Sequence, residues 1–161
     1  MRRALALLAT TLSLSACGQP APVPEAASNW AFAIGKNSVE MAWLVDPTAP
    51  ANPPLRLVCA RGGGFRVSVT AFKPIGSEER LTIGAGDEAF ALVAIAAENE
   101  HGALVRATGP VEAGLMAMIE SGKPIAASYG AQSFGPVDAP PQAMRRAFAD
   151  SCRKLDGEAA V

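Results

Sequence analysis

The sequence predicts a mainly β, α+β fold: an antiparallel β-sheet or β-sandwich with two helices, the last of them C-terminal and joined to a strand by a disulfide. Short apolar runs that alternate with polar residues recur along the chain, and turn signals separate them. Only two segments have the periodicity of an amphipathic helix. A parallel sheet would need a helix after most of its strands, and the sequence lacks that regularity.

The first sixteen residues have the parts of a secretory signal. Arg2 and Arg3 are positively charged, residues 4–14 are mostly apolar, and Ser15 and Ala16 are small residues before Cys17. The apolar run is too short to cross about 30 Å of hydrocarbon as a permanent transmembrane helix. We therefore expect residues 1–16 to be a signal peptide that is removed on export.

The four residues Leu14-Ser15-Ala16-Cys17 resemble the lipobox of bacterial lipoproteins. The resemblance implies that Cys17 becomes the first residue and carries fatty acids such as palmitate on its sulfur and amine. Two or three acyl chains anchor a protein stably, since each buried CH₂ contributes about 0.8 kcal/mol. Gly18, where an aspartate would retain an enteric lipoprotein in the inner membrane, implies an outer-membrane anchor with the domain in the periplasm. The alternative is an ordinary signal peptide with a cysteine at its cleavage point.

The mature chain has the size of one domain. Cleavage before Cys17 leaves 145 of the 161 residues, which is enough to bury about two-thirds of the unfolded surface around one core. We expect residues 17–29 to be a lipidated proline- and alanine-rich linker, residues 30–155 a single globular domain, and residues 156–161 a flexible tail. The mature chain has 12 Lys and Arg against 15 Asp and Glu, a formal net charge of −3, so it has no general attraction for nucleic acid.

The first half of the domain is predicted to be four strands. The runs at 30–34 and 39–45 flank the turn signal GKNS, and the proline-rich segment 46–54 is unsuited to a central strand. The runs at 55–59 and 65–72 alternate and are expected to form a hairpin around Gly62-Gly63-Gly64. One face of this hairpin should hold Leu55, Leu57, Cys59, Phe65, Val67, Val69 and Ala71, and the other Arg56, Val58, Arg66, Ser68, Thr70 and Phe72.

The second half is predicted to contain both helices. Pro110 suits the first position of a helix over 110–121, and Asp138 suits the N-cap of a helix over 139–155. Their apolar stripes are Val111, Leu115, Met118 and Ile119 in the first helix, and Met144, Phe148, Cys152 and Leu155 in the second. Further strands are expected at 80–83, 88–97, 103–108, 123–129 and 132–137.

The chain has three cysteines, and lipid on Cys17 would leave an even pair in an oxidising compartment. Cys59 is expected on the inward face of a strand, and Cys152 on the inward stripe of the C-terminal helix. Both thiols should therefore point into one core, which predicts a Cys59–Cys152 disulfide. The alternative is two buried free cysteines that pack as small hydrophobic side chains.

No group of residues predicts an enzyme or a cofactor. His101 lies between Glu98 and Glu100 on one side and Gly102 on the other, but structural metal sites need three or four convergent ligands, and carboxylates in turns are normally solvated. Ser133 lacks the G-x-S-x-G spacing of a nucleophile elbow. Gly84-Ala85-Gly86 is followed by two acidic residues, which would repel phosphate. We therefore expect neither a metal site nor a catalytic site.

Basic residues offer a candidate binding surface. Four lie off the apolar stripe of the C-terminal helix, two point outward from the predicted hairpin, and one lies in its loop. If the disulfide draws helix and hairpin together, these residues could form one cationic surface for anionic lipid, lipopolysaccharide or an acidic envelope protein. The alternative is a charged face that keeps the domain soluble, with Asp150 offsetting part of the charge. The residues are Arg56, Arg61, Arg66, Arg145, Arg146, Arg153 and Lys154.

The two cysteine-bearing segments, LRLVC and AFADSC, give the domain a loose similarity to small disulfide-stapled periplasmic β-proteins of the invasion-associated and type VI secretion-associated kind. The resemblance transfers no functional residue. Together these observations favour a lipid-anchored, non-catalytic binding or structural module of the envelope. A second hypothesis is an inhibitor of a periplasmic or host hydrolase, such as a lysozyme or protease, that inserts the loop ARGGG or GAGDE. A third is a cell-wall enzyme that uses Glu98, Glu100 or His101.

Overall fold

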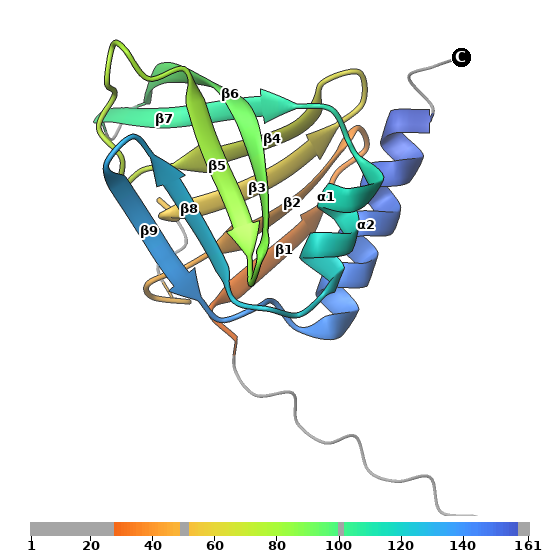
Figure 1. The fold of residues 1–161 in the computed structure, drawn as a ribbon. Helices are drawn as coiled ribbons and strands as arrows, with labels where there is room; N and C mark the ends of the chain where they lie inside the picture. Colours follow the sequence, from red (N-terminus) through yellow and green to blue (C-terminus); the bar gives the residue numbers. More distant parts are fainter. Residues whose placement is uncertain (1–27, 49–51, 100–101, 158–161) are drawn as a thin grey trace, which may run out of the picture.

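The computed structural model describes residues 28–48, 52–99 and 102–157. The predicted signal peptide, Cys17, most of the predicted linker, His101 and the last four residues lie outside the described residues. The described part of the chain forms a strongly curled antiparallel sheet with two helices packed at one side of it (Figure 1). This confirms the predicted fold class, in its single-sheet rather than its sandwich form.

Nine strands make up the sheet, and each predicted strand has its counterpart. The runs predicted at 30–34 and 132–137 have the observed ends, and the other strand ends differ from prediction by at most three residues, since strand ends depend on pairing partners that the sequence does not specify. The strands are β1 (Trp30–Ile34), β2 (Ser38–Trp43), β3 (Leu55–Ala60), β4 (Gly64–Val69), β5 (Arg80–Ala85), β6 (Glu88–Asn99), β7 (Gly102–Gly109), β8 (Ile125–Tyr129) and β9 (Gln132–Val137).

The strand order is β1-β2-β3-β4-β7-β6-β5-β8-β9, and every pairing is antiparallel. Neighbours along the chain pair within β1–β4, within β5–β7 and between β8 and β9. Two pairings join these groups, β4 with β7 and β5 with β8. The middle group is thus inserted in reverse order, which places β7 beside the β3–β4 hairpin.

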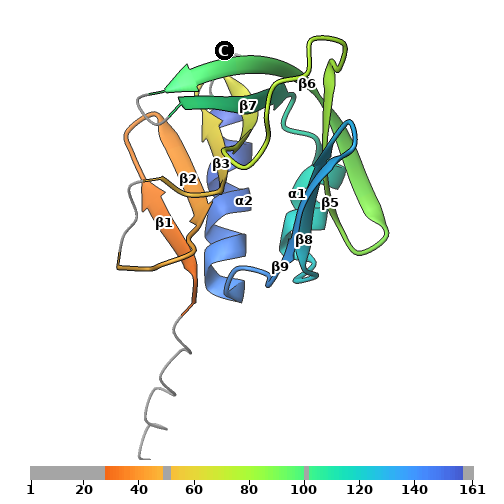
Figure 2. The same ribbon diagram turned by 90° about the vertical axis from the view of Figure 1, so that its left-hand side faces the viewer.

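The sheet curls until its two edges approach each other. Strands β1–β3 and strands β5, β8 and β9 form opposite walls, with the helices between them (Figure 2). The Trp30 indole nitrogen donates a hydrogen bond to the Asp138 carbonyl at 2.7 Å. The Trp43 and Phe134 rings meet edge to face with their centroids 5.6 Å apart. These contacts hold the β1 side of the sheet to the segment that contains and follows β9.

The two helices begin later than the sequence predicts. Helix α1 (Ala113–Glu120) has Glu112 at its N-cap, and Pro110 lies outside the helix. Helix α2 (Gln142–Gly157) begins beyond Pro140 and Pro141, so Asp138 is not its N-cap. The predicted α2 start was wrong because a residue before proline is driven from helical towards extended backbone, and Ala139 and Pro140 each precede a proline.

The core lies on the inner face of the curled sheet, beneath both helices. The predicted stripes are buried, with Leu115, Met118 and Ile119 from α1 and Phe148, Cys152 and Leu155 from α2, whereas Val111 and Met144 pack at its margin. Helix α2 contacts β2 and β3, and α1 contacts α2 and β5. The sheet therefore turns one face towards the helices and the other towards the outside.

The predicted Cys59–Cys152 disulfide is present, with 5.3 Å between the two Cα atoms. Cys59 pairs across the ladder with Phe65 of β4, and Phe148 lies one helical turn before Cys152. The Phe65 and Phe148 rings meet edge to face with centroids 6.4 Å apart. Helix α2 is thus fixed to the β3–β4 hairpin by a covalent bond and an adjacent aromatic contact.

The β3–β4 hairpin turns at the predicted glycines. Gly62 and Gly64 have φ values of +67° and +62°, a conformation that residues with a Cβ rarely adopt. Beyond the turn the predicted alternation holds to Val69, where β4 ends. Contrary to prediction, Ala71 is exposed and Phe72 is buried against Tyr129, since the chain leaves the sheet before reaching them.

Gly64→Ala is expected to destabilise the fold more than Gly62→Ala. A Cβ on Gly64 would lie 2.5 Å from the Gly109 carbonyl oxygen of β7, whereas a Cβ on Gly62 would meet no atom within 4 Å. Both changes carry the left-handed backbone cost of about 1–2 kcal/mol, and only Gly64→Ala also disturbs the β4–β7 pairing. Urea unfolding of both variants should separate them by about 1 kcal/mol or more, and equal losses would contradict this contact.

Candidate binding surface

Three arginines lie together on the outer face of the sheet, opposite the helices. Arg56 of β3 pairs with Ser68 of β4, and Ser68 pairs with Arg106 of β7, so these side chains form one cross-strand row. Arg66 lies two residues before Ser68 on β4, in the neighbouring row. We call Arg56, Arg66 and Arg106 the arginine face.

The register keeps the arginine face compact. Arg66 is the diagonal neighbour of both Arg56 and Arg106, because it pairs with Val58 on one side and Thr108 on the other. Diagonal neighbours on adjacent strands lie about 7–8 Å apart, and a spacing of two strands is about 10 Å. The three arginines therefore start from neighbouring positions in a small patch of sheet.

The charge of the arginine face is only partly neutralised within the protein. Arg56 makes an ion pair with Glu40 of β2, with 3.1 Å between Nε and Oε1. Within the described ranges, neither Arg66 nor Arg106 makes an ion pair, and the Nε atom of each is buried without a hydrogen-bond partner. Both residues are half-buried, so their stems lie along the sheet, and no described carboxylate pairs with either positive charge.

Exposed aliphatic side chains border the arginine face. Ile95 of β6 pairs with Arg106, and Val93 pairs with Thr108. Both residues therefore extend the cross-strand rows of the arginine face onto β6. Their exposed fractions are 50% for Ile95 and 61% for Val93, which makes them two of the four large exposed hydrophobic residues among the described ones. This part of the outer face thus combines arginines with apolar side chains.

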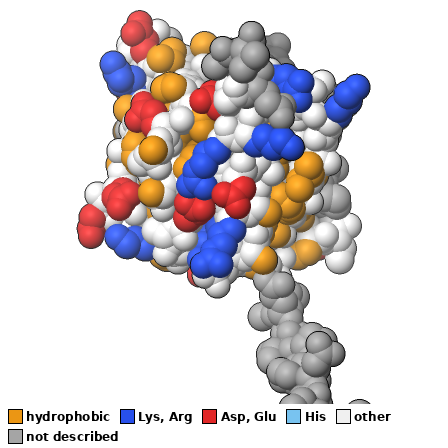
Figure 3. All heavy atoms as spheres, turned by 90° about the vertical axis from the view of Figure 1, so that its right-hand side faces the viewer, with side chains coloured by type: hydrophobic (Ala, Val, Ile, Leu, Met, Phe, Trp, Pro, Cys, Tyr) orange, Lys and Arg blue, Asp and Glu red, His pale blue; other side chains and the backbone are white. Residues whose placement is uncertain are grey.

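Of the two alternatives for the basic residues, a single cationic surface does not form in the described part of the chain. Helix α2 packs on the inner face of the sheet, so its basic residues are separated by the sheet from Arg56 and Arg66. The disulfide does join helix and hairpin, but through the face that carries Cys59 and Leu57. On the helix side, Lys, Arg, Asp and Glu side chains are intermixed on the surface (Figure 3).

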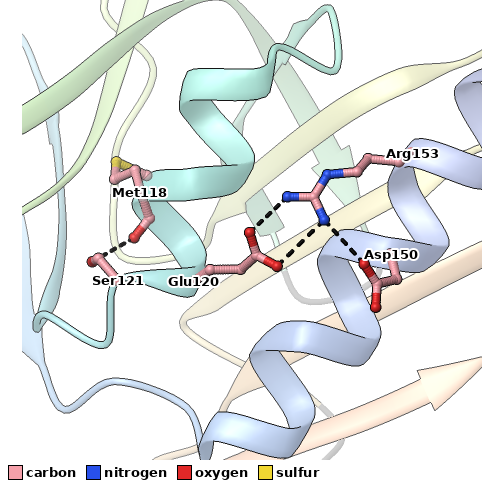
Figure 4. Close-up of polar contacts among 5 residues, drawn as sticks. All are labelled: Met118, Glu120, Ser121, Asp150 and Arg153. Atoms are coloured by element: carbon pink, nitrogen blue, oxygen red, sulfur yellow. Dashed lines mark hydrogen bonds and ion pairs between the residues drawn. The ribbon is translucent and has the colours of Figure 1, made fainter.

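Arg153 illustrates this mixing. Its Nη2 lies 2.6 Å from Glu120 Oε2 of α1, and its Nη1 lies 3.0 Å from Asp150 Oδ1 (Figure 4). The hydrogen bond with Glu120 is the main reason that the pKa of Arg153 is raised, against the opposing effect of burial. The charge of Arg153 is therefore used to link α1 and α2, and it is balanced by two carboxylates.

The other predicted basic residues have separate positions. Arg145 donates a hydrogen bond from Nη1 to the Pro140 carbonyl at 2.6 Å, which supports the start of α2. Arg146 is exposed on α2. Arg61 and Lys154 do meet, together with Lys36, around a hollow of about 170 Å³ at the end of α2 beside the β1–β2 turn.

A second, larger groove of about 640 Å³ lies on the outer face of the sheet over β5, β8 and β9. Thr82, Ser128 and Ser133 form a cross-strand row of hydroxyl-bearing residues that lines it. Asp87 in the turn between β5 and β6 and Glu88 at the start of β6 lie at its border, so the segment GAGDE covers a tight strand-to-strand turn with acidic side chains.

The remaining candidates give no constellation. Ser133 lies on β9, and His101 lies outside the described residues together with Glu100. The described part of the chain contains no group of three or more His, Cys, Asp or Glu residues that could hold a metal ion. None of its helices is long and apolar enough to cross a membrane.

Comparison with known proteins yields no relative. No protein-family model, no curated protein and no solved structure matches the chain.

Sequence reasoning missed Arg106 as a site residue. The run ALVRAT was correctly read as a strand, and its alternation puts Leu104, Arg106 and Thr108 on one face. What links Arg106 to Arg66 is the pairing of β4 with β7, which joins segments about 40 residues apart in the chain. An arginine at an outward position of a strand was the available signal, but only the strand order makes it part of a cluster.

Proposed function

We propose that the protein is a lipid-anchored, non-catalytic binding module of the bacterial envelope, tethered to the outer membrane by Cys17 and exposed to the periplasm. The observation that supports this most is that two of the three cysteines are joined to each other and the third is at the lipobox-like sequence. Cys59 and Cys152 are joined in a buried disulfide, so neither is free for lipid or catalysis. Cys17 is the third cysteine, and it stands at the end of the lipobox-like sequence LSAC.

The disulfide also supports an exported location. Disulfides persist in oxidising compartments such as the periplasm and are rare in the cytosol. Cys59 and Cys152 are 1% and 0% exposed, so their bond is shielded by the core. A structural disulfide of this kind fits a domain that works outside the cytoplasm.

A binding role is supported by the arginine face. Surface arginines usually meet carboxylates or water, whereas Arg66 and Arg106 lie half-buried beside exposed aliphatic side chains. Such a surface is suited to an anionic partner that also offers apolar groups. An enzyme that acts on cell-wall sugar would need a pair of carboxyls held in a cleft, whereas the adjacent residues Asp87 and Glu88 are exposed at the turn and at the start of β6.

Cys17→Ser should move the protein from the membrane to the soluble fraction of a Gram-negative host. Two or three acyl chains give stable anchoring, and the substitution removes the sulfur that would receive the first of them. Ser15→Gly is the matched control, because it keeps a small residue before Cys17 and should leave the protein in the membrane fraction. A wild-type chain that is soluble, or a Cys17→Ser chain that stays with the membrane by its N-terminus, would contradict the tether.

A further inference from the structure

We infer that the arginine face, with Ile95 and Val93 beside it, docks directly on the anionic phospholipid headgroups of a membrane surface. The inference rests on the proposed function for the presence of a membrane next to the domain. The binding itself is a property of the folded sheet, so it can be measured without the lipid on Cys17.

The chemistry of arginine suits phosphate. A guanidinium group is planar, stays charged, and presents N–H donors in a fork that matches two phosphate oxygens. Arg66 and Arg106 have no carboxylate partner among the described residues, so a phosphate would not have to displace an internal ion pair. Their half-buried stems limit the rotamer freedom that docking would remove.

The spacing of the three arginines favours a surface over a small anion. Their backbone positions lie about 7–10 Å from one another on a sheet, a spread that suits an array of phosphates. A membrane leaflet presents many phosphates side by side, and each guanidinium can meet a different one. Arg61 and Lys154 do line one hollow together, but it lies at the end of α2 and is not part of the arginine face.

The aliphatic neighbours add a membrane-specific element. Ile95 is 50% exposed and Val93 is 61% exposed, and both lie in the rows that contain the arginines. Apolar side chains next to cationic ones are typical of surfaces that rest at the boundary between headgroups and acyl chains. A purely ionic contact with an acidic protein would have no use for them.

The net negative charge of the mature chain does not oppose this docking. The Debye length is about 8 Å at physiological ionic strength, so charges on the helix side are screened from a membrane that meets the opposite face. On β2–β4 and β7 the one acidic residue with a described side chain on the outer face is Glu40, which is engaged by Arg56. Among the described side chains of the outer face of β2–β4 and β7, arginines therefore outnumber carboxylates.

The tether would keep the domain within reach of the surface. Twelve residues separate Cys17 from Trp30, which span at most about 40 Å when fully extended. A lipid anchor and a basic patch together form the two-signal arrangement that gives stable membrane attachment.

The test measures binding of the mature chain with Cys17→Ser to vesicles of phosphatidylcholine with and without phosphatidylglycerol. Each arginine without a carboxylate partner should strengthen binding to an anionic surface about fivefold, so phosphatidylglycerol should raise the affinity about 25-fold through Arg66 and Arg106. Arg66→Gln with Arg106→Gln should weaken binding to the anionic vesicles about 25-fold. Arg66→Lys with Arg106→Lys, which keeps the charge, should stay within about threefold of the parent chain.

The matched control is Arg146→Gln with Lys154→Gln, which removes the same charge from exposed positions on α2. It should change vesicle binding less than about twofold, because these residues face away from the docked surface. Equal losses in both double variants, or no preference for phosphatidylglycerol, would overturn the inference. Competition by free inorganic phosphate at low concentration would also overturn it, because it would identify a small-anion site.

A measurement on the chain without arginine substitutions tests the same charges in a protein that no arginine substitution can misfold. Raising the salt concentration should weaken binding of the Cys17→Ser chain to the anionic vesicles, because surface charges are screened. Salt-independent binding would overturn the inference. If the arginine face does not bind vesicles, the lipid on Cys17 would still hold the protein at the membrane. Failure of the docking proposal can therefore be told apart from failure of the lipid tether.

Discussion

Replacing Cys59 and Cys152 together with alanine is expected to lower the free energy of unfolding by about 4 kcal/mol. The disulfide closes a loop with a sequence separation of 93 residues, and cross-links of that length restrict the unfolded chain strongly. A domain of this size has a total stability of about 5–15 kcal/mol, so the change removes a large share of it. Guanidinium unfolding monitored by tryptophan fluorescence measures the loss.

The reference for this measurement is the Cys17→Ser chain, so that both proteins lack the third thiol. The same reference protein, fully reduced and kept under reductant, should show a similar loss, because it has lost the cross-link but not the two sulfur atoms. A loss of less than about 1 kcal/mol in both would show that the bond does not restrain the unfolded chain as inferred.

Phe148→Ala is expected to cost about 3–5 kcal/mol, the usual range for a fully buried phenylalanine. Phe148 has 0% of its surface exposed, and it packs against Phe65 one turn from the disulfide. Its removal leaves a cavity between α2 and β4 that the cross-linked helix cannot close by moving freely. Urea unfolding of the disulfide-intact protein gives the value.

Met144→Ala is the control for Phe148→Ala, because Met144 lies on the same stripe of α2 but only at the margin of the core. It should cost clearly less than Phe148→Ala, about 1 kcal/mol. A double-mutant cycle between Phe65 and Phe148 should also reveal a coupling of about 0.5–1.5 kcal/mol from their edge-to-face contact. Equal effects at positions 144 and 148, with no coupling to Phe65, would contradict the packing.

The local pattern of the sequence was enough to predict the strands and the Cys59–Cys152 disulfide. The strict alternation around LRLVC and FRVSV fixes which residues face the core, because side chains on a strand alternate between faces. The glycine turn then sets the hairpin, and the stripe of α2 presents Cys152 inward. These local rules are enough to predict the disulfide, because Cys59 lies on the buried face of its strand and Cys152 on the buried stripe of its helix.

The grouping of the basic residues could not be predicted by the same rules. Whether Arg56 and Arg66 share a surface with α2 depends on which face of the sheet the helix covers, and the disulfide places it on the opposite face. That Arg106 joins them depends on the β4–β7 pairing, and a strand contains no local signal for a distant partner. The helix starts were misplaced for a more local reason, the competing preference of residues before proline.

The fold assigns different tasks to the two faces of the sheet. The inner face holds the core and the disulfide, and both helices pack on it. The outer face presents the arginine face and the neighbouring groove over β5, β8 and β9 on rigid strands. A binding surface of this kind can change its side chains without altering the core, which fits a small envelope module.

The most direct test of the account is the intact mass of the protein extracted from membranes, after thiol alkylation with and without prior reduction. The account predicts a chain that begins at Cys17 and carries fatty acid, with no alkylated thiol before reduction and two alkylated cysteines, 59 and 152, after it. A chain without fatty acid, or one in which Cys59 and Cys152 are alkylated before reduction, would contradict it.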